Sequence, residues 1–160
     1  MKITQNYTFY VAVIIMQYIL ELEGTKIIFN AEEDEAEKVK RVVTELITKM
    51  GFVNLDIYDI VNVLDGAEDV WTGEYTASGR YKVNGAILTA LKNTSGIIGA
   101  KSLIVSVVSG FETPLAEISE VAHILELCCN DDENHINIVW GHVLDGTMED
   151  EMRVSIIAIA

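Results

Sequence analysis

The residues best suited to chemistry lie in one short acidic stretch, Gly51 to Asp59, which reads GFVNLDIYD. Within it, Asn54, Asp56 and Asp59 place a carboxamide and two carboxylates at the spacing N-x-D-x-x-D. Two carboxylates beside a phosphate can orient a water molecule and help to hold a cation. The same spacing also suits a solvated turn, in which Asp56 caps a helix that begins near Ile57. The spacing alone does not separate these two interpretations.

The histidines and cysteines give weaker signals. His123, His135 and His142 lack the spacing of metal ligands, so each is expected to be a surface residue or a hydrogen-bonded core residue. Cys128 and Cys129 are adjacent, and vicinal cysteines form a strained disulfide. They are expected to be two small helix residues in a reducing compartment. We therefore predict that this chain alone holds no metal and no cofactor.

Composition and charge narrow the class of protein. The chain has 160 residues, half of them hydrophobic, which is enough for one domain with a real core. A formal net charge of −14 argues against binding to nucleic acid or to an anionic membrane surface, and favours partners with basic patches or bound cations. The apolar residues 9–20 are too short for a spanning helix and lack the features of a signal peptide. A cytoplasmic protein is the simplest expectation.

The elements that must position the acidic stretch begin with an apolar segment. Residues 7–22 predict one long strand or two short ones, and Glu23-Gly24 can turn them into a second strand over residues 25–30. A short internal helix is the alternative, because periodicity does not separate the two. A helix is then predicted over residues 31–50, with Asn30 as its N-cap and Gly51 as the residue that ends it.

The rest of the sequence, together with these elements, predicts an α+β fold. A mixed sheet of four strands with flanking helices is expected to follow the N-terminal β element and the helix over residues 31–50. A short helix is expected after the acidic stretch, ending near Leu64, and the order from Asp69 is β-α-β-α-β-β. The expected strands cover residues 69–78, 101–110, 135–146 and 151–160, and the expected helices cover residues 79–93 and 115–129.

Three blocks of the chain resemble FtsZ, the bacterial tubulin-like division protein family. TELITKMGFVNLDIYDI looks like the end of that family's central helix followed by its synergy loop. GAKSLIVSVVSGFETPLAEISEVAHIL is similar to a strand-and-helix segment of its C-terminal domain, and INIVWGHVLDGTMEDEMRVSIIAIA to its closing strand pair. The blocks keep the family's order and spacing. Residues 31–160 are therefore identified as resembling the FtsZ C-terminal domain with its loop, and residues 1–30 as a β element of unknown origin.

The resemblance implies a site shared between two subunits. In the family, the loop of one subunit inserts over the GTP of its neighbour, where its aspartates polarise the attacking water and help to hold a cation. Asn54, Asp56 and Asp59 keep that pattern and are the candidate catalytic residues, although Met50 replaces the family's proline. The glycine-rich signature G-G-G-T-G-[ST]-G is absent, so the chain is expected to bind no GTP alone. GTP and a cation would come from a partner subunit, and the chain alone is not expected to be an enzyme.

Three functions remain open on this basis. The chain could be an interaction module that completes or caps the GTP site of an FtsZ-type subunit. It could be a domain that merely associates with itself and carries an inert loop, or a fragment of a full-length FtsZ-type GTPase. The partner is therefore expected to be an FtsZ-type protein or a second copy. Without a GTPase domain the central helix would expose an apolar face, and residues 7–29 are expected to cover it by folding back or by dimerisation.

Overall fold

The computed structural model describes residues 15–160, so the part of the predicted first strand before residue 15 lies outside the described residues. In chain order the elements are β1 (Met16–Leu22), β2 (Thr25–Ala31), α1 (Glu33–Thr48), α2 (Ile57–Leu64), β3 (Val70–Ser78), α3 (Lys82–Asn93), β4 (Ser102–Ser109), α4 (Leu115–Cys129), β5 (Asn137–Leu144) and β6 (Glu151–Ile159).

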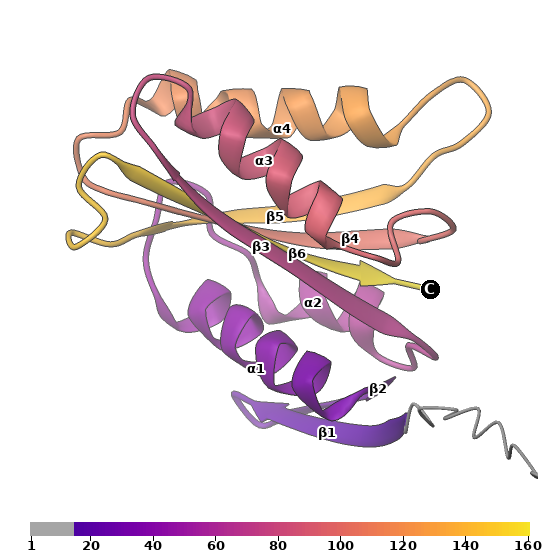
Figure 1. The fold of residues 1–160 in the computed structure, drawn as a ribbon. Helices are drawn as coiled ribbons and strands as arrows, with labels where there is room; N and C mark the ends of the chain where they lie inside the picture. The colour runs from indigo at the N-terminus through magenta and orange to yellow at the C-terminus, as the bar shows by residue number, and fades with distance from the viewer. Residues whose placement is uncertain (1–14) are drawn as a thin grey trace, which may run out of the picture.

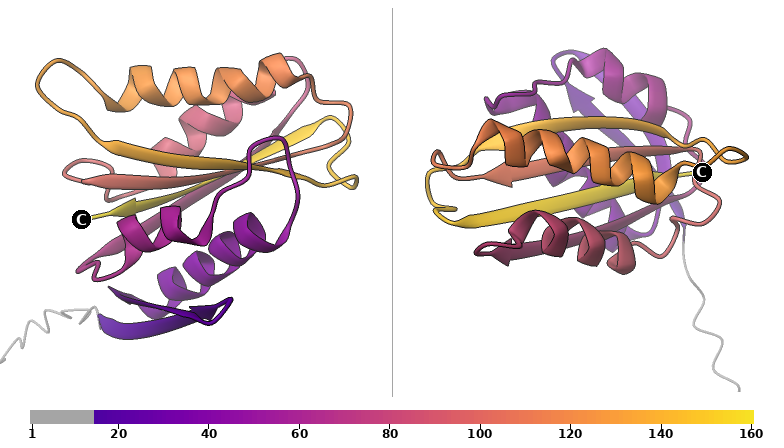
Figure 2. Two further views of the ribbon diagram at one scale, coloured as in Figure 1. Left: turned by 180° about the vertical axis from the view of Figure 1, so that it is seen from behind. Right: turned by 90° about the horizontal axis from the view of Figure 1, so that it is seen from above.

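The main sheet has four strands in the order β3-β6-β4-β5. β4 and β5 run parallel, whereas β6 pairs antiparallel with both β3 and β4, so the sheet is mixed. Helices α3 and α4 cover one face, and α1 and α2 cover the other (Figures 1 and 2). This arrangement confirms the predicted α+β fold and the β-α-β-α-β-β order.

Each face of the sheet has its own hydrophobic core. Side chains of a strand alternate between faces, and β6 shows this clearly. Met152, Val154 and Ile156 pack with α3 and α4, whereas Ile157 and Ile159 belong to the core that contains α1 and α2. The near-continuous apolar sequence of β6 follows, because both of its faces are buried.

The N-terminal hairpin forms as predicted, and the alternative of an internal helix is wrong for residues 16–31. β1 and β2 pair antiparallel without interruption, from Met16 opposite Ala31 to Leu22 opposite Thr25. The two turn residues, Glu23 and Gly24, have φ values of 49° and 77°. A two-residue turn with both φ values positive matches the right-handed twist of the flanking strands.

The hairpin packs on the side of α1 and α2 that faces away from the main sheet (Figure 1). Leu20, Ile27 and Phe29 are buried in the same core as Val39 and Val43 of α1. The prediction that the N-terminal segment folds back over the central helix is therefore confirmed for the described part of the hairpin.

The predicted N-cap of the first helix is wrong. The N-cap is Glu32, and Asn30 still belongs to β2. The backbone N–H of Asn30 donates to the carbonyl of Ala67 at 2.9 Å, which keeps Asn30 in an extended conformation. The first turn of α1 is acidic, with Glu33 at the first helical position, which suits the helix dipole.

Candidate functional site

The acidic loop, defined here as residues 49–59, joins α1 to the first turn of α2. Asn54, Asp56 and Asp59 are all exposed in it. The structure therefore places the three predicted site residues together on the surface, and their contacts show what holds them there.

Asp56 and Asp59 form the N-terminal cap of α2. Asp56 Oδ1 accepts a hydrogen bond from the backbone N–H of Tyr58 at 2.8 Å. Asp59 Oδ2 accepts one from the backbone N–H of Asp56 at 3.0 Å, which completes a capping box. The expectation that Asp56 caps this helix is confirmed. Within residues 15–160, Asp59 Oδ1 takes part in no hydrogen bond, and Asp59 as a whole is exposed.

Asn54 closes the turn that precedes the helix. Its Oδ1 accepts from the backbone N–H of Gly51 at 3.1 Å, and its Nδ2 donates to the carbonyl of Gly51 at 3.1 Å. Both ends of the carboxamide are thus engaged within the loop. In this conformation Asn54 shapes the backbone that carries the two aspartates.

The loop also pairs with the edge of β5. The backbone N–H of Leu144 donates to the carbonyl of Met50 at 3.0 Å, and that of His142 donates to the carbonyl of Val53 at 2.7 Å. Between them Gly51 lies so close that an added Cβ would stand 1.7 Å from the carbonyl oxygen of His142. The prediction that Gly51 ends the helix is wrong: α1 ends at Thr48 with Lys49 as its C-cap, and glycine at position 51 is required by this close approach.

The side chain of His142 holds the loop through contacts with Phe52. The side chain is buried, and its Nδ1 accepts a hydrogen bond from the backbone N–H of Phe52 at 3.2 Å. The proton of the neutral ring therefore lies on Nε2, which donates to Ser109 Oγ at 2.8 Å. Burial lowers the pKa of His142, which favours this neutral form. The Phe52 ring stacks on the imidazole with centroids 5.5 Å apart.

The sequence predicted His142 as either a surface or a hydrogen-bonded core residue, and the second of these is confirmed. Its link to the acidic loop was not predicted. Phe52 and His142 are 90 positions apart, and no local pattern connects them. Ser109 was missed for the same reason, since only the parallel pairing of β4 with β5 brings it beside the ring.

The acidic loop also carries an apolar rim, a name used here for its exposed residues Met50, Phe52 and Tyr58. Met50, Phe52 and Tyr58 are each more than half exposed, although all three are large and apolar or aromatic. Methionine and aromatic side chains are enriched at protein–protein interfaces. The loop thus combines exposed carboxylates with contact residues of the kind that dock on another protein.

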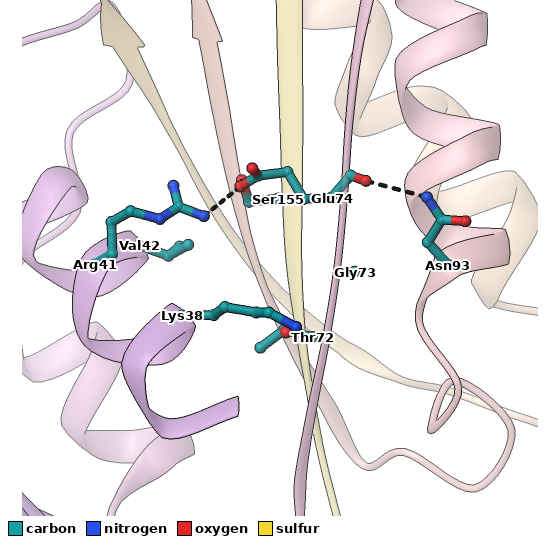
Figure 3. A pocket seen from close by; sticks show the side chains of 8 residues that line it. All are labelled: Lys38, Arg41, Val42, Thr72, Gly73, Glu74, Asn93 and Ser155. Atoms are coloured by element: carbon teal, nitrogen blue, oxygen red, sulfur yellow. Dashed lines mark hydrogen bonds and ion pairs between the residues drawn. The ribbon is translucent and has the colours of Figure 1, made fainter. Parts of the chain in front are cut away.

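A polar cavity of about 310 Å³ lies between α1 and β3 (Figure 3). At this cavity Arg41 Nη2 contacts Glu74 Oε2 at 2.5 Å. Outside the residues that line it, Arg153 Nη2 binds both carboxylate oxygens of Glu45 at 2.9 and 2.7 Å. Burial alone would raise the pKa of Glu74, but hydrogen bonds from Ser155 and Arg41 hold it below its ordinary value. This network fastens α1 to the sheet and so orients the helix from which the acidic loop departs.

Other candidate chemistry is not supported by the geometry. No group of three or more His, Cys, Asp or Glu side chains within residues 15–160 could hold a metal ion. Cys128 and Cys129 are both free, and burial raises the pKa of the Cys129 thiol to about 11. In the described part of the chain, no helix is both long enough and apolar enough to cross a membrane.

A family description for the C-terminal domain of FtsZ matches residues 66–160, more than half of the chain. The chain belongs to the FtsZ family. It is an FtsZ/tubulin-like C-terminal domain, from a family of cytoskeletal cell-division proteins. The matched residues begin after the acidic loop, so this match does not bear on the loop.

Solved structures share the fold. An empty FtsZ dimer from M. jannaschii aligns with a TM-score of 0.66 and 23% identity, over 78% of this chain and 38% of that chain. A mutant FtsZ from M. jannaschii aligns with a TM-score of 0.67 and 24% identity, over 78% of this chain and 37% of that chain. TubZ from Bacillus thuringiensis serovar israelensis, in GDP-form protofilaments, aligns with a TM-score of 0.51 and 10% identity. The alignment covers 69% of this chain and 30% of that chain. The chain thus spans little more than a third of the length of the FtsZ chains that it matches.

Proposed function

We propose that this chain is an interaction module for an FtsZ-type subunit, and that its acidic loop meets the GTP-bearing face of that subunit. The observation that supports this proposal is that Asp56 and Asp59 are exposed on a loop that is held at both ends. β5 and His142 hold its first half, and the capping box holds its second half. Such a loop presents two carboxylates in a fixed position.

The chemistry would be supplied in two parts. The partner subunit would bring GTP and a cation, and this chain would bring Asp56 and Asp59. Fixed carboxylates favour an in-line water by accepting hydrogen bonds from it, which suits hydrolysis of a phosphate anhydride. Asp59 Oδ1, which has no partner among the described residues, is the oxygen best placed to accept from a water. Asn54 would act as a positioning residue, because its carboxamide is occupied by Gly51.

The apolar rim would supply the contact with the partner. Met50, Phe52 and Tyr58 flank the acidic groups and would be buried on docking. The chain carries a net charge of −14, so the facing surface is expected to be basic or to hold the cation. A cytoplasmic location would follow from such a partner.

A second function competes with this one. The capping box alone is a sufficient structural reason for an aspartate at position 56 and at position 59, so the loop could be inert in a domain that associates with itself. A test must therefore remove the negative charges without removing the cap. Asparagine caps a helix about as well as aspartate does, which makes the substitution Asp→Asn suitable.

The experiment measures GTP turnover by a full-length FtsZ while this chain is titrated in. The Asp56→Asn/Asp59→Asn variant tests the charges, and the Asp56→Ala/Asp59→Ala variant also removes the cap. The matched control, Asp132→Asn/Glu133→Gln, removes two exposed charges in the turn between α4 and β5, which leads into the opposite end of β5. The chain without FtsZ serves as the blank and is expected to show no turnover.

We expect the wild-type chain and the control variant to change the rate equally, and the Asn/Asn variant to change it differently. An Asn/Asn variant that matches wild type would mean that the carboxylates do no chemistry. A rate that stays flat at saturation for every variant would leave the self-associating domain as the better explanation.

A further inference from the structure

The N-terminal hairpin has one closed edge and one open edge. The outer edge of β2 is closed by the segment after α2: Gly66 N–H donates to the Ile28 carbonyl at 2.7 Å, and Ile28 N–H donates to Asp65 Oδ1 at 2.8 Å. Within residues 15–160, β1 pairs with β2 alone, so its other edge carries no backbone partner. β1 lies at the periphery of the fold (Figure 1).

β1 lacks the features that usually protect an open edge. Proteins block such edges with proline, lysine, bulges or very short strands. β1 reads MQYILEL, pairs through seven consecutive residues without a bulge, and carries a single charge, Glu21. A two-stranded ribbon is itself marginal, and additional strands stabilise it.

The outer face of the hairpin is apolar at its centre. Ile19 is 64% exposed and lies directly opposite Ile28, which is 39% exposed. The charges on this face, Glu21 and Lys26, are opposite one another in the register and cancel. In a chain with a net charge of −14, this is a face on which two copies could meet without strong repulsion.

We propose that β1 pairs antiparallel with β1 of a second copy, around a two-fold axis at Ile19, to form a continuous four-stranded sheet. In this register Ile19 lies opposite Ile19 of the second copy, so the outer face gains an unbroken row of four isoleucines. The next row runs Lys26, Glu21, then Gln17 and Asn30 of the second copy. No like charges oppose each other, which satisfies the cross-strand rule for charged pairs.

The inner face fits the same register. Tyr18 lies opposite Leu20 of the second copy, which gives the row Phe29, Tyr18, then Leu20 and Ile27 of that copy. Tyr18 and Leu20 also line a cavity of about 320 Å³ between the hairpin and α1. The buried Tyr18 hydroxyl has no hydrogen-bond partner among residues 15–160. The strand with the open edge therefore also borders a cavity that the described residues leave unfilled. This inference does not rest on the acidic loop or on the proposed function.

The test is the oligomeric state of the full chain, measured by sedimentation velocity over a range of concentrations. Ile19→Lys and Ile19→Glu each place like charges across the two-fold axis. The matched control is Leu127→Lys, which makes the same kind of change at an exposed apolar residue of α4, on the other side of the main sheet. Far-UV circular dichroism checks that every variant is folded, as the exposure of Ile19 leads us to expect.

We expect the wild type and Leu127→Lys to dimerise, and each Ile19 variant to dissociate about tenfold more readily or more. An equimolar mixture of Ile19→Lys and Ile19→Glu should recover the dimer, because opposite charges then face each other at the axis. The proposal would be overturned by a monomeric wild type, by an Ile19→Lys variant that dimerises as strongly as wild type, or by a mixture of the two Ile19 variants that stays monomeric. A hairpin edge that binds FtsZ while the chain alone stays monomeric would overturn it too.

Discussion

The backbone N–H of Phe52 donates a hydrogen bond to Nδ1 of His142, a buried residue 90 positions later in the chain. The contact places the imidazole against the segment that leads into Asn54, Asp56 and Asp59. It also ties the loop to Ser109, because the same ring donates from Nε2 to that hydroxyl. The position of the acidic residues thus depends on side chains near the C-terminal ends of β4 and β5.

Replacing His142 should loosen the loop without removing an acidic residue. Glutamine at position 142 can still donate to Ser109 from its amide nitrogen, but Phe52 loses its acceptor. We expect a loss of about 1 kcal/mol in the free energy of unfolding, which is the usual worth of one hydrogen bond. Hydrogen exchange should show weaker protection of the Phe52 amide in His142→Gln.

The control for that experiment is His123→Gln, because His123 is an exposed residue of α4. It should leave both the stability and the Phe52 amide unchanged. Undiminished protection of Phe52 in His142→Gln would show that the imidazole does not hold the loop.

The same histidine predicts a pH dependence of stability. Burial lowers the pKa of His142 in the folded chain below its ordinary 6.5. Between the lowered value and 6.5 the unfolded chain binds a proton that the folded chain does not, so stability falls as the pH falls through this window. One proton limits the slope to about 1.4 kcal/mol per pH unit.

The measurement is urea denaturation of wild type and His142→Gln from pH 8 to about pH 5, a range above the ordinary carboxylate pKa values. The stability difference between the two proteins should shrink as the pH falls. Glu74, Asp131 and Asp145 have pKa values lowered by their hydrogen bonds, and their contributions are lost only at more acidic pH, equally in both proteins. A constant difference across the range would contradict the assignment.

Elements with strong local patterns were predictable from the sequence. The continuous apolar strands and the helices with apolar residues at helical spacing appear where expected, and Pro114 immediately precedes α4. The three site residues, Asn54, Asp56 and Asp59, could be grouped because they lie within a stretch of six positions. Local spacing is enough to bring such residues onto one turn.

Features that depend on contacts between distant segments were not predictable. Asn30 has the sequence signature of an N-cap, but its bond to Ala67 keeps it in a strand. Gly51 has the signature of a helix C-terminus, but its role is the close approach to His142. In both cases a tertiary contact overrides a local preference, and one sequence without structure does not reveal that contact.

The close approach at Gly51 gives a steric prediction. A Cβ at this position would overlap the backbone of His142, so Gly51→Ala must push the loop away from β5. Overpacking of this kind costs about 1–3 kcal/mol, measurable by urea denaturation. The control is Gly85→Ala within α3, where a Cβ would meet only the Ala77 side chain at 3.3 Å and alanine is the better helix former. Equal stability of Gly51→Ala and wild type would show that the loop has room to move.

Two substitutions at position 56 separate the structural role of Asp56 from its proposed chemical role. Asp56→Ala removes the oxygen that accepts from Tyr58 N–H, and the loss of such a cap costs about 0.5–2 kcal/mol. Asp56→Asn keeps an acceptor at that position and should cost much less. Urea denaturation of both variants measures the difference. Should Asp56→Asn destabilise the chain as much as Asp56→Ala, the charge itself would be part of the fold, and an effect of the asparagine variants on GTP turnover could no longer be assigned to chemistry.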